Sequence, residues 1–188
     1  MNATMLRAPR TIALSALAAL SLALTAPVAA DAAKINTKVN ATLKDFRENT
    51  PPKVHRYVAT AKGVLVFPDV IKAGIGIGGE YGEGALLVGN KVVDYYSVAG
   101  ASIGFQLGAQ SRAQIILFMT PKALQSFRAS KGWKAGVDGS VALITLGAGG
   151  EVLTPDADKQ AVLGFVYGAK GLMYNLNFEG QKFTKIKP

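Results

Sequence analysis

The sequence contains no cysteine, and it has one histidine and one tryptophan among its 188 residues. Without cysteine the chain can form no disulfide and offers no thiol to which a lipid could be attached. A single histidine cannot supply the ligands of a structural zinc site, so we expect neither a metal nor another cofactor. The fold must therefore be held together by its hydrophobic core.

Long apolar runs are also scarce. The main one, residues 11–24, follows Arg7 and Arg10 and is short for a membrane span but typical in length of a signal-peptide core. We therefore expect residues 1–30 to be a signal peptide, with an uncleaved membrane anchor as the alternative. No later run reaches the ~18 apolar residues of a membrane helix, so no second span is expected.

Small residues follow this run, and cleavage after Ala30 or after Ala32 would suit signal peptidase. The remainder, residues 31–188, has the length of a single domain. We expect that domain to be exported, and to be periplasmic, peripheral on an envelope membrane, or secreted.

Acidic residues are the minority among the charged ones. The chain has 12 Asp and Glu against 21 Lys and Arg, a net charge of +9 at pH 7. Such a balance favours an anionic partner. For an exported chain we expect lipid headgroups or the anionic cell envelope as that partner, and no nucleic acid.

Residues 31–49 have the pattern of an amphipathic helix. Apolar residues recur at helical spacing, with basic residues between them. Such a helix either lies in a membrane interface with its apolar side down or packs that side against a sheet. The apolar positions are Ile35, Val39, Leu43 and Phe46, and the basic ones are Lys34, Lys38, Lys44 and Arg47.

Two further helices are expected. One begins at Pro51-Pro52 and ends before Gly63, and the other is capped by Thr120 and runs to Gly132. The second leads into Lys131-Gly-Trp133-Lys134. A tryptophan beside lysines suits the headgroup level of a membrane, and the alternative is that Trp133 covers the edge of the core.

Most of the chain after residue 63 has the period of two that is typical of strands. Gly89-Asn90 joins two apolar runs as a hairpin turn, and QIILFM, residues 114–119, is apolar on both faces and so predicts a central strand. Later strands are expected at about 134–148, 161–169 and 171–179. The predicted fold is α+β: an antiparallel sheet or small barrel with glycine-rich strands, packed against N-terminal helices and one intervening helix.

The stretch GIGIGGEYGEG, residues 74–84, fits the dinucleotide-binding pattern G-x-G-x-x-G. That pattern requires a helix after the third glycine, whereas a hairpin follows here, so we interpret the stretch as a strand with glycine on one face. Residues 100–108 have the same pattern of glycines on one face of a strand. A helix pressed close, the curvature of a small barrel, or a ligand would have to fill the space above these glycines.

The sequence contains no complete set of catalytic residues. Ser102 lies in a G-x-S-x-G pattern, the motif of the nucleophile elbow in hydrolases. That motif needs a strand-to-helix turn and a later histidine, whereas His55 comes earlier. Asp156 and Asp158 are two carboxylates without the rest of a calcium loop, and turn chemistry explains them. We do not expect an enzyme.

Four segments together resemble the SYLF-domain family in the same order along the chain. They are AKGVLVFPDVIKAGIGIGGEYGEGALLV (61–88), YYSVAGASIGFQLGAQS (95–111), ILFMTPKAL (116–124), and TPDAD (154–158) followed by KGL (170–172) and FEG (178–180). The resemblance implies a compact domain without known catalysis that binds anionic phospholipids. In eukaryotic endocytic relatives it also binds actin, a partner that we do not expect for an exported chain.

In eukaryotic relatives a basic amphipathic N-terminal helix provides much of the lipid contact, which the resemblance places at residues 34–47. One departure is YGAKG, residues 167–171, where many members have Ser-Arg-Ser-Lys-Gly and thus one more arginine. A protein or polysaccharide of the envelope is the alternative partner, and the oligomeric state is not predicted. The candidate lipid-binding residues are Lys34, Lys38, Lys44, Arg47, Lys62, Lys72, Trp133 and Lys134.

Overall fold

The computed structural model describes residues 31–104, 109–146, 151–168, 171–172 and 178–188. The predictions for residues 1–30 lie outside this range. The helices are α1 (Ala32–Asn49), α2 (Pro52–Thr60), α3 (Pro121–Ala129) and the short 3₁₀ helix η1 (Ala157–Lys159). The strands are β1 (Gly63–Val88), β2 (Lys91–Gly104), β3 (Ala109–Phe118), β4 (Trp133–Lys134), β5 (Ala142–Leu143), β6 (Val162–Gly168), β7 (Gly171–Leu172) and β8 (Lys182–Ile186).

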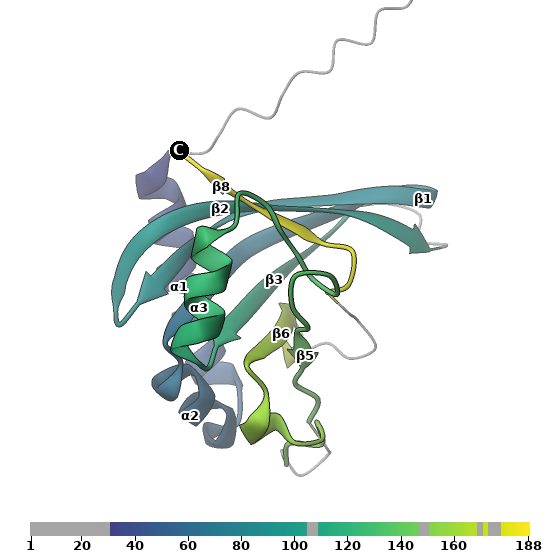
Figure 1. Cartoon of the computed structure of the whole chain (residues 1–188). Helices are drawn as coiled ribbons and strands as arrows, with labels where there is room; N and C mark the ends of the chain where they lie inside the picture. Colours follow the sequence, from purple (N-terminus) through teal and green to yellow (C-terminus); the bar gives the residue numbers. More distant parts are fainter. Residues whose placement is uncertain (1–30, 105–108, 147–150, 169–170, 173–177) are drawn as a thin grey trace, which may run out of the picture.

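The strands form one curled, half-barrel sheet in the order β4-β8-β2-β1-β3-β6-β5, with β7 beside β6 (Figure 1). All pairs are antiparallel except β5 with β6. The predicted α+β class, with an antiparallel sheet and N-terminal helices, is confirmed. Gly89, with φ of 62°, occupies the first turn position between β1 and β2, as the hairpin prediction required.

The predicted helices form, and their termini follow from the sequence. The carboxylate of Asp31 accepts a hydrogen bond from the backbone N–H of Ala33 at 2.9 Å, which caps α1. Proline occupies the first turn of α2, and Thr120 caps α3 through the N–H of Ala123 at 3.2 Å. The third helix ends at Ala129, three residues earlier than predicted.

The two faces of the sheet carry different helices. Because side chains alternate along a strand, Ile115 and Leu117 of β3 pack in the cluster that contains the buried sides of α1 and α2. Ile116 and Phe118 face the other way and pack with Phe127 of α3. Residues of β3 are therefore buried on both faces, which confirms the central strand predicted from QIILFM.

The glycines of residues 74–84 allow β1 to fold back on itself. Residues 63–73 of β1 pair with β3, whereas residues 76–88 pair with β2. A methyl group added at Gly82 would come within 2.6 Å of the carbonyl oxygen of Asp69, and Gly84 lies still closer to that of Val66. A straight strand would hold residues 66 and 84 roughly 60 Å apart, at about 3.3 Å per residue. The curvature of the sheet therefore fills the space above these two glycines.

One strand prediction is wrong, one lies mostly outside the described residues, and one strand was not predicted. The stretch 134–148 forms only the short strands β4 and β5, and its loops are held by contacts such as that of the Thr154 hydroxyl with Leu143 and Thr145. The predicted strand 171–179 begins as β7, and its residues 173–177 lie outside the described residues, so that prediction is not tested there. Strand β8 was not predicted, since it is short and follows directly on the turn at Gly180, where φ is 81°.

A polar cluster is buried within the sheet. Nη2 of Arg112 lies 2.5 Å from Oε2 of Glu80, and Nε2 of Gln181 donates to Oε1 of Glu80 at 2.6 Å. Each of the three residues is at most 8% exposed. Because they belong to β3, β1 and the residue before β8, the cluster joins three distant parts of the chain.

Tyr96 of β2 is expected to make the protein sensitive to alkaline pH. Its ring is fully buried and its hydroxyl has no hydrogen-bond partner among the described residues. Burial, and then the charge of Asp94, raises the pKa of Tyr96 to about 12. The unfolded chain therefore loses this proton first, so stability falls as the pH rises from about 10 to about 12.

Tyr96→Phe is expected to stay within about 1 kcal/mol of the wild type at pH 7, because no hydrogen bond is lost. The variant should lose less stability than the wild type between pH 9 and pH 11. Urea unfolding at the two pH values measures both effects. An equal alkaline loss in the two proteins would contradict the prediction.

Candidate functional site

The basic residues of α1 do not form one patch. Successive residues of an α-helix are about 100° apart around its axis. Lys38 therefore flanks one edge of the buried stripe, with Lys34 one turn before it, whereas Arg47 flanks the opposite edge. Lys44 points outward, 3.9 Å from Glu48, and all four basic residues are exposed.

The apolar stripe of α1 is not available to a membrane. Ile35, Val39, Leu43 and Phe46 are each at most 7% exposed and pack against the sheet. The alternative that the stripe packs on the sheet is confirmed. Any membrane contact made by α1 must then use its polar edges and the surfaces beside them.

One such edge borders a cleft between α1 and the folded strand β1, which we call the α1–β1 cleft. Its volume is about 210 Å³. Ile71 and Tyr81 of β1 line it and remain 52% and 36% exposed, which makes them two of the few exposed large hydrophobic residues in the described chain. The lining residues are Lys34, Ile35, Lys38, Pro68, Asp69, Ile71, Tyr81, Gly82 and Glu83.

Charge is unevenly distributed in the α1–β1 cleft. Nζ of Lys38 lies 2.7 Å from Oδ2 of Asp69, and both side chains are about half exposed. Lys34 has no ion pair among the described residues. The Tyr81 hydroxyl donates to Glu83 at 2.7 Å, and partial burial followed by this bond raises the pKa of Tyr81 to about 12. The α1–β1 cleft thus combines two lysines, of which Lys34 has no ion pair among the described residues, with the carboxylates of Asp69 and Glu83 and the apolar side chains of Ile71 and Tyr81.

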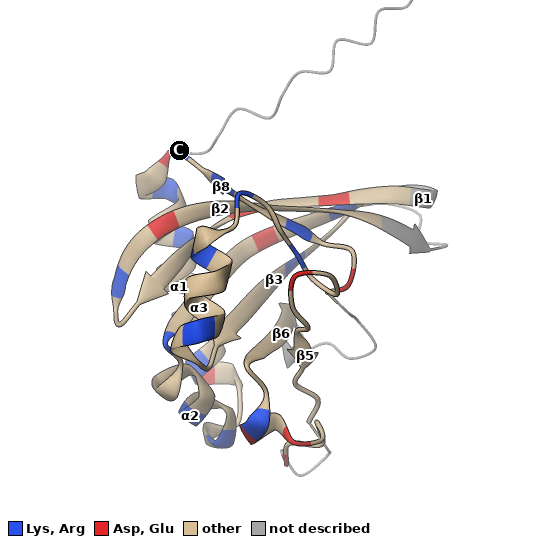
Figure 2. Ribbon diagram, in the orientation of Figure 1, with Lys and Arg blue, Asp and Glu red and all other residues tan. Residues whose placement is uncertain are grey.

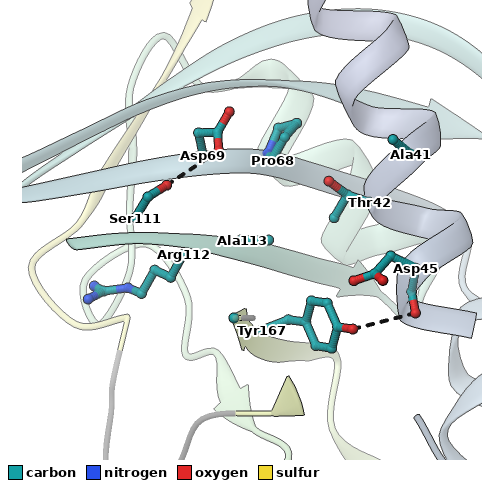
Figure 3. Close-up of a pocket in the computed structure, with 10 residues that line it drawn as sticks. Ala41, Thr42, Asp45, Pro68, Asp69, Ser111, Arg112, Ala113 and Tyr167 are labelled. Carbon is teal, nitrogen blue, oxygen red and sulfur yellow. Dashed lines mark hydrogen bonds between the residues drawn. The ribbon is translucent and has the colours of Figure 1, made fainter. Parts of the chain in front are cut away.

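A second pocket on the same side of α1 has a different character (Figure 3). It has a volume of about 320 Å³ and contains the carboxylates of Asp45 and Asp69 together with the hydroxyls of Ser111 and Tyr167. Arg112 contributes to its wall, but its guanidinium points away from Asp45 and Tyr167 and pairs with Glu80. Because no basic side chain of the described residues points into it, this pocket offers an anionic ligand no cation there.

The remaining candidate residues lie elsewhere. Lys62 is exposed after α2, at the opposite end of α1 from Lys34. Lys72 is half-buried and, by strand alternation, lies on the face of β1 opposite to Ile71. Lys134 is exposed on β4 and, by strand alternation, points away from the cluster in which Trp133 and Ala135 pack with α3. The structure therefore brings only Lys34 and Lys38 together in one site.

The expectation of a surface tryptophan is corrected. Trp133 is 4% exposed and packs its ring against Phe127 and Phe183, with centroids 5.7 Å from each. Gly139 approaches the indole closely enough that a methyl group there would lie 2.8 Å from it. The alternative prediction, that Trp133 covers the edge of the core, is confirmed.

The residues that the sequence did not support as catalytic or metal-binding either have structural contacts or, for Ser102, do not lie in a nucleophile elbow. Ser102 lies within β2, opposite Gly78, and not at a strand-to-helix turn. His55 Nε2 lies 3.1 Å from the hydroxyl of Thr50. Asp156 begins η1 and pairs with Lys159, while Asp158 pairs with Arg56 at 2.9 Å. Within the described ranges no group of three acidic or histidine side chains could hold a metal ion.

Positive charge is spread over several elements. Figure 2 shows basic residues on α1, α2, α3 and β8. In the part of the chain that the structure describes, no helix is both long enough and apolar enough to cross a membrane.

Residues 99–187 match the model of the Ysc84 family, described as "Las17-binding protein actin regulator". This match confirms the resemblance to the SYLF-domain family, a lipid-binding and non-enzymatic domain type, over that part of the chain. No curated protein matches the chain. The matched part begins within β2, so it includes Trp133 and Lys134 but not α1, α2 or β1. The family match therefore does not extend to Lys34 and Lys38.

Proposed function

We propose that the chain is a non-enzymatic domain that binds anionic phospholipid at a membrane surface through the α1–β1 cleft. The carrying observation is that Lys34 and Lys38 border the same cleft as the exposed side chains of Ile71 and Tyr81. Ammonium groups attract a phosphate, and the apolar floor suits the glycerol and upper acyl carbons beneath it.

The two lysines contribute differently in this proposal. Lys34 offers its whole charge, whereas Lys38 already shares its charge with Asp69 at 2.7 Å. A bound phosphate would compete with Asp69 for Lys38, which orients the headgroup between the two ammonium groups. Because both lysines are exposed, binding should weaken steeply with added salt.

Export and the absence of actin binding belong to the same proposal. If residues 1–30 direct export, the domain meets the periplasmic face of an envelope membrane. The family description names Las17 and actin, which such a domain would not encounter. A protein or polysaccharide partner is the competing function.

The double variant Lys34→Gln/Lys38→Gln tests the proposed site by co-sedimentation of residues 31–188 with vesicles. Each lysine near an anionic surface is worth about 1 kcal/mol, so binding to phosphatidylglycerol-containing vesicles should weaken roughly 30-fold at low salt. The matched control is Lys122→Gln/Lys131→Gln, which removes two exposed charges on the α3 side of the sheet. This control should lose less than threefold.

If the two double variants lost vesicle binding equally, the interaction would depend only on the net charge of the protein. That outcome would contradict the proposed site. Absence of wild-type binding to anionic vesicles at low salt would contradict the lipid function itself and favour the protein or polysaccharide partner.

A further inference from the structure

A third cavity lies on the opposite edge of α1, between α2 and the turn that joins β1 to β2. We call it the α2 pocket. Its volume is about 350 Å³, within the ~300–1,000 Å³ range of small-molecule sites. The lining residues are Arg47, His55, Val58, Ala59, Ala61, Val64, Leu87, Gly89 and Asn90.

The inner wall of the α2 pocket is aliphatic. Val64 and Leu87, from the two halves of β1, are each 7% exposed and belong to the core beneath α1. Val58 of α2 and Ala61, the residue after this helix, pack against the same core. A hydrocarbon chain in this pocket would contact side chains that the fold already holds in place.

The polar residues of the α2 pocket favour an anion. Arg47 is exposed and has no ion pair among the described residues. The Thr50 hydroxyl donates its proton to the carbonyl oxygen of Phe46 at 2.5 Å, so it must accept from Nε2 of His55, 3.1 Å away. This arrangement fixes the histidine ring beside the pocket, and none of the described residues that line the pocket is acidic.

We propose that the α2 pocket binds a single anionic amphiphile with a short aliphatic tail. The head group pairs with Arg47, and the tail lies along Val58, Val64 and Leu87. This inference goes beyond the proposed membrane-surface function, because the ligand is a monomer taken from solution at a separate site. It does not require the α1–β1 cleft to bind lipid.

Octanoate tests the pocket by isothermal titration calorimetry, with amide chemical shifts of Ala61, Gly89 and Asn90 as the local readout. Acetate lacks the tail and octanol lacks the charge, so each should bind at least tenfold more weakly than octanoate. Arg47→Gln should weaken octanoate about tenfold, the scale of one charge-assisted contact. Ala59→Phe, at an exposed position of the lining, should block the pocket while the fold is retained.

Lys53→Gln is the matched control, since Lys53 is exposed on α2 but does not line the pocket. It should leave octanoate affinity unchanged within twofold, as should Lys34→Gln/Lys38→Gln. Octanoate binding that is insensitive to both Arg47→Gln and Ala59→Phe, or no octanoate binding at all, overturns the proposal. Neither result bears on vesicle binding. The experiments can therefore contradict the α2 pocket without contradicting the membrane-surface function, and the reverse.

Discussion

Replacing Arg112 with methionine is expected to lower the free energy of unfolding by about 3–5 kcal/mol, because Glu80 would keep a buried charge without its partner. Glu80 and Arg112 are each 8% exposed, so water cannot compensate. Gln181 alone would remain to hydrogen-bond the carboxylate. Urea unfolding followed by circular dichroism measures the loss.

The triple variant Glu80→Leu/Arg112→Met/Gln181→Leu is the companion experiment. It removes the whole polar cluster, and replacing a complete buried ion pair by apolar residues is often neutral or stabilising. We expect the triple variant to be more stable than Arg112→Met by at least about 2 kcal/mol. If Arg112→Met were no less stable than the wild type, the ion pair would not be buried as the structure shows.

Gly84→Val is expected to prevent β1 from folding back, and to cost more than the ~1–3 kcal/mol of ordinary overpacking. The added side chain would meet the carbonyl oxygen of Val66 and the ring of Phe67. A carbonyl that belongs to a paired strand cannot move aside as a flexible side chain can. We expect little folded protein by circular dichroism at 25 °C.

Gly79→Ala is the control for this effect on the same strand. A methyl group at Gly79 would find its nearest neighbour, the carbonyl oxygen of Gly100, at 3.8 Å, which is an ordinary contact. The free energy of unfolding of Gly79→Ala, measured from its midpoint in urea, should stay within about 1 kcal/mol of the wild type. Similar losses for Gly79→Ala and Gly84→Val would mean that glycine matters here for chain flexibility and not for close approach.

Local features of the sequence predicted the helices well. Periodicity and capping residues such as Asp31 and Thr120 act within a few residues, so they can be recognised without knowing the fold. The same holds for the Gly89-Asn90 turn. Strand β8 has no comparable signal, because five residues with a turn before them are shorter than the pattern needs to stand out.

Contacts between distant parts of the chain could not be predicted. The glycines of 74–84 indicated a strand with a bare face, but not that Gly84 meets Val66 of the same strand. The exposure of Ile71 depends on how β1 folds back on itself, and so does the position of Ile71 beside Lys34. The separation of Lys38 from Arg47, in contrast, follows from helix geometry and was open to prediction from their spacing.

The pairing of β8 with β2 has a consequence for the order of events during synthesis. Tyr95 pairs with Ile186, so this edge of the sheet closes only when residues separated by roughly 90 positions meet, a slow, long-range step in folding. Until β8 emerges from the ribosome, the backbone of β2 is open to pairing with any other nascent strand.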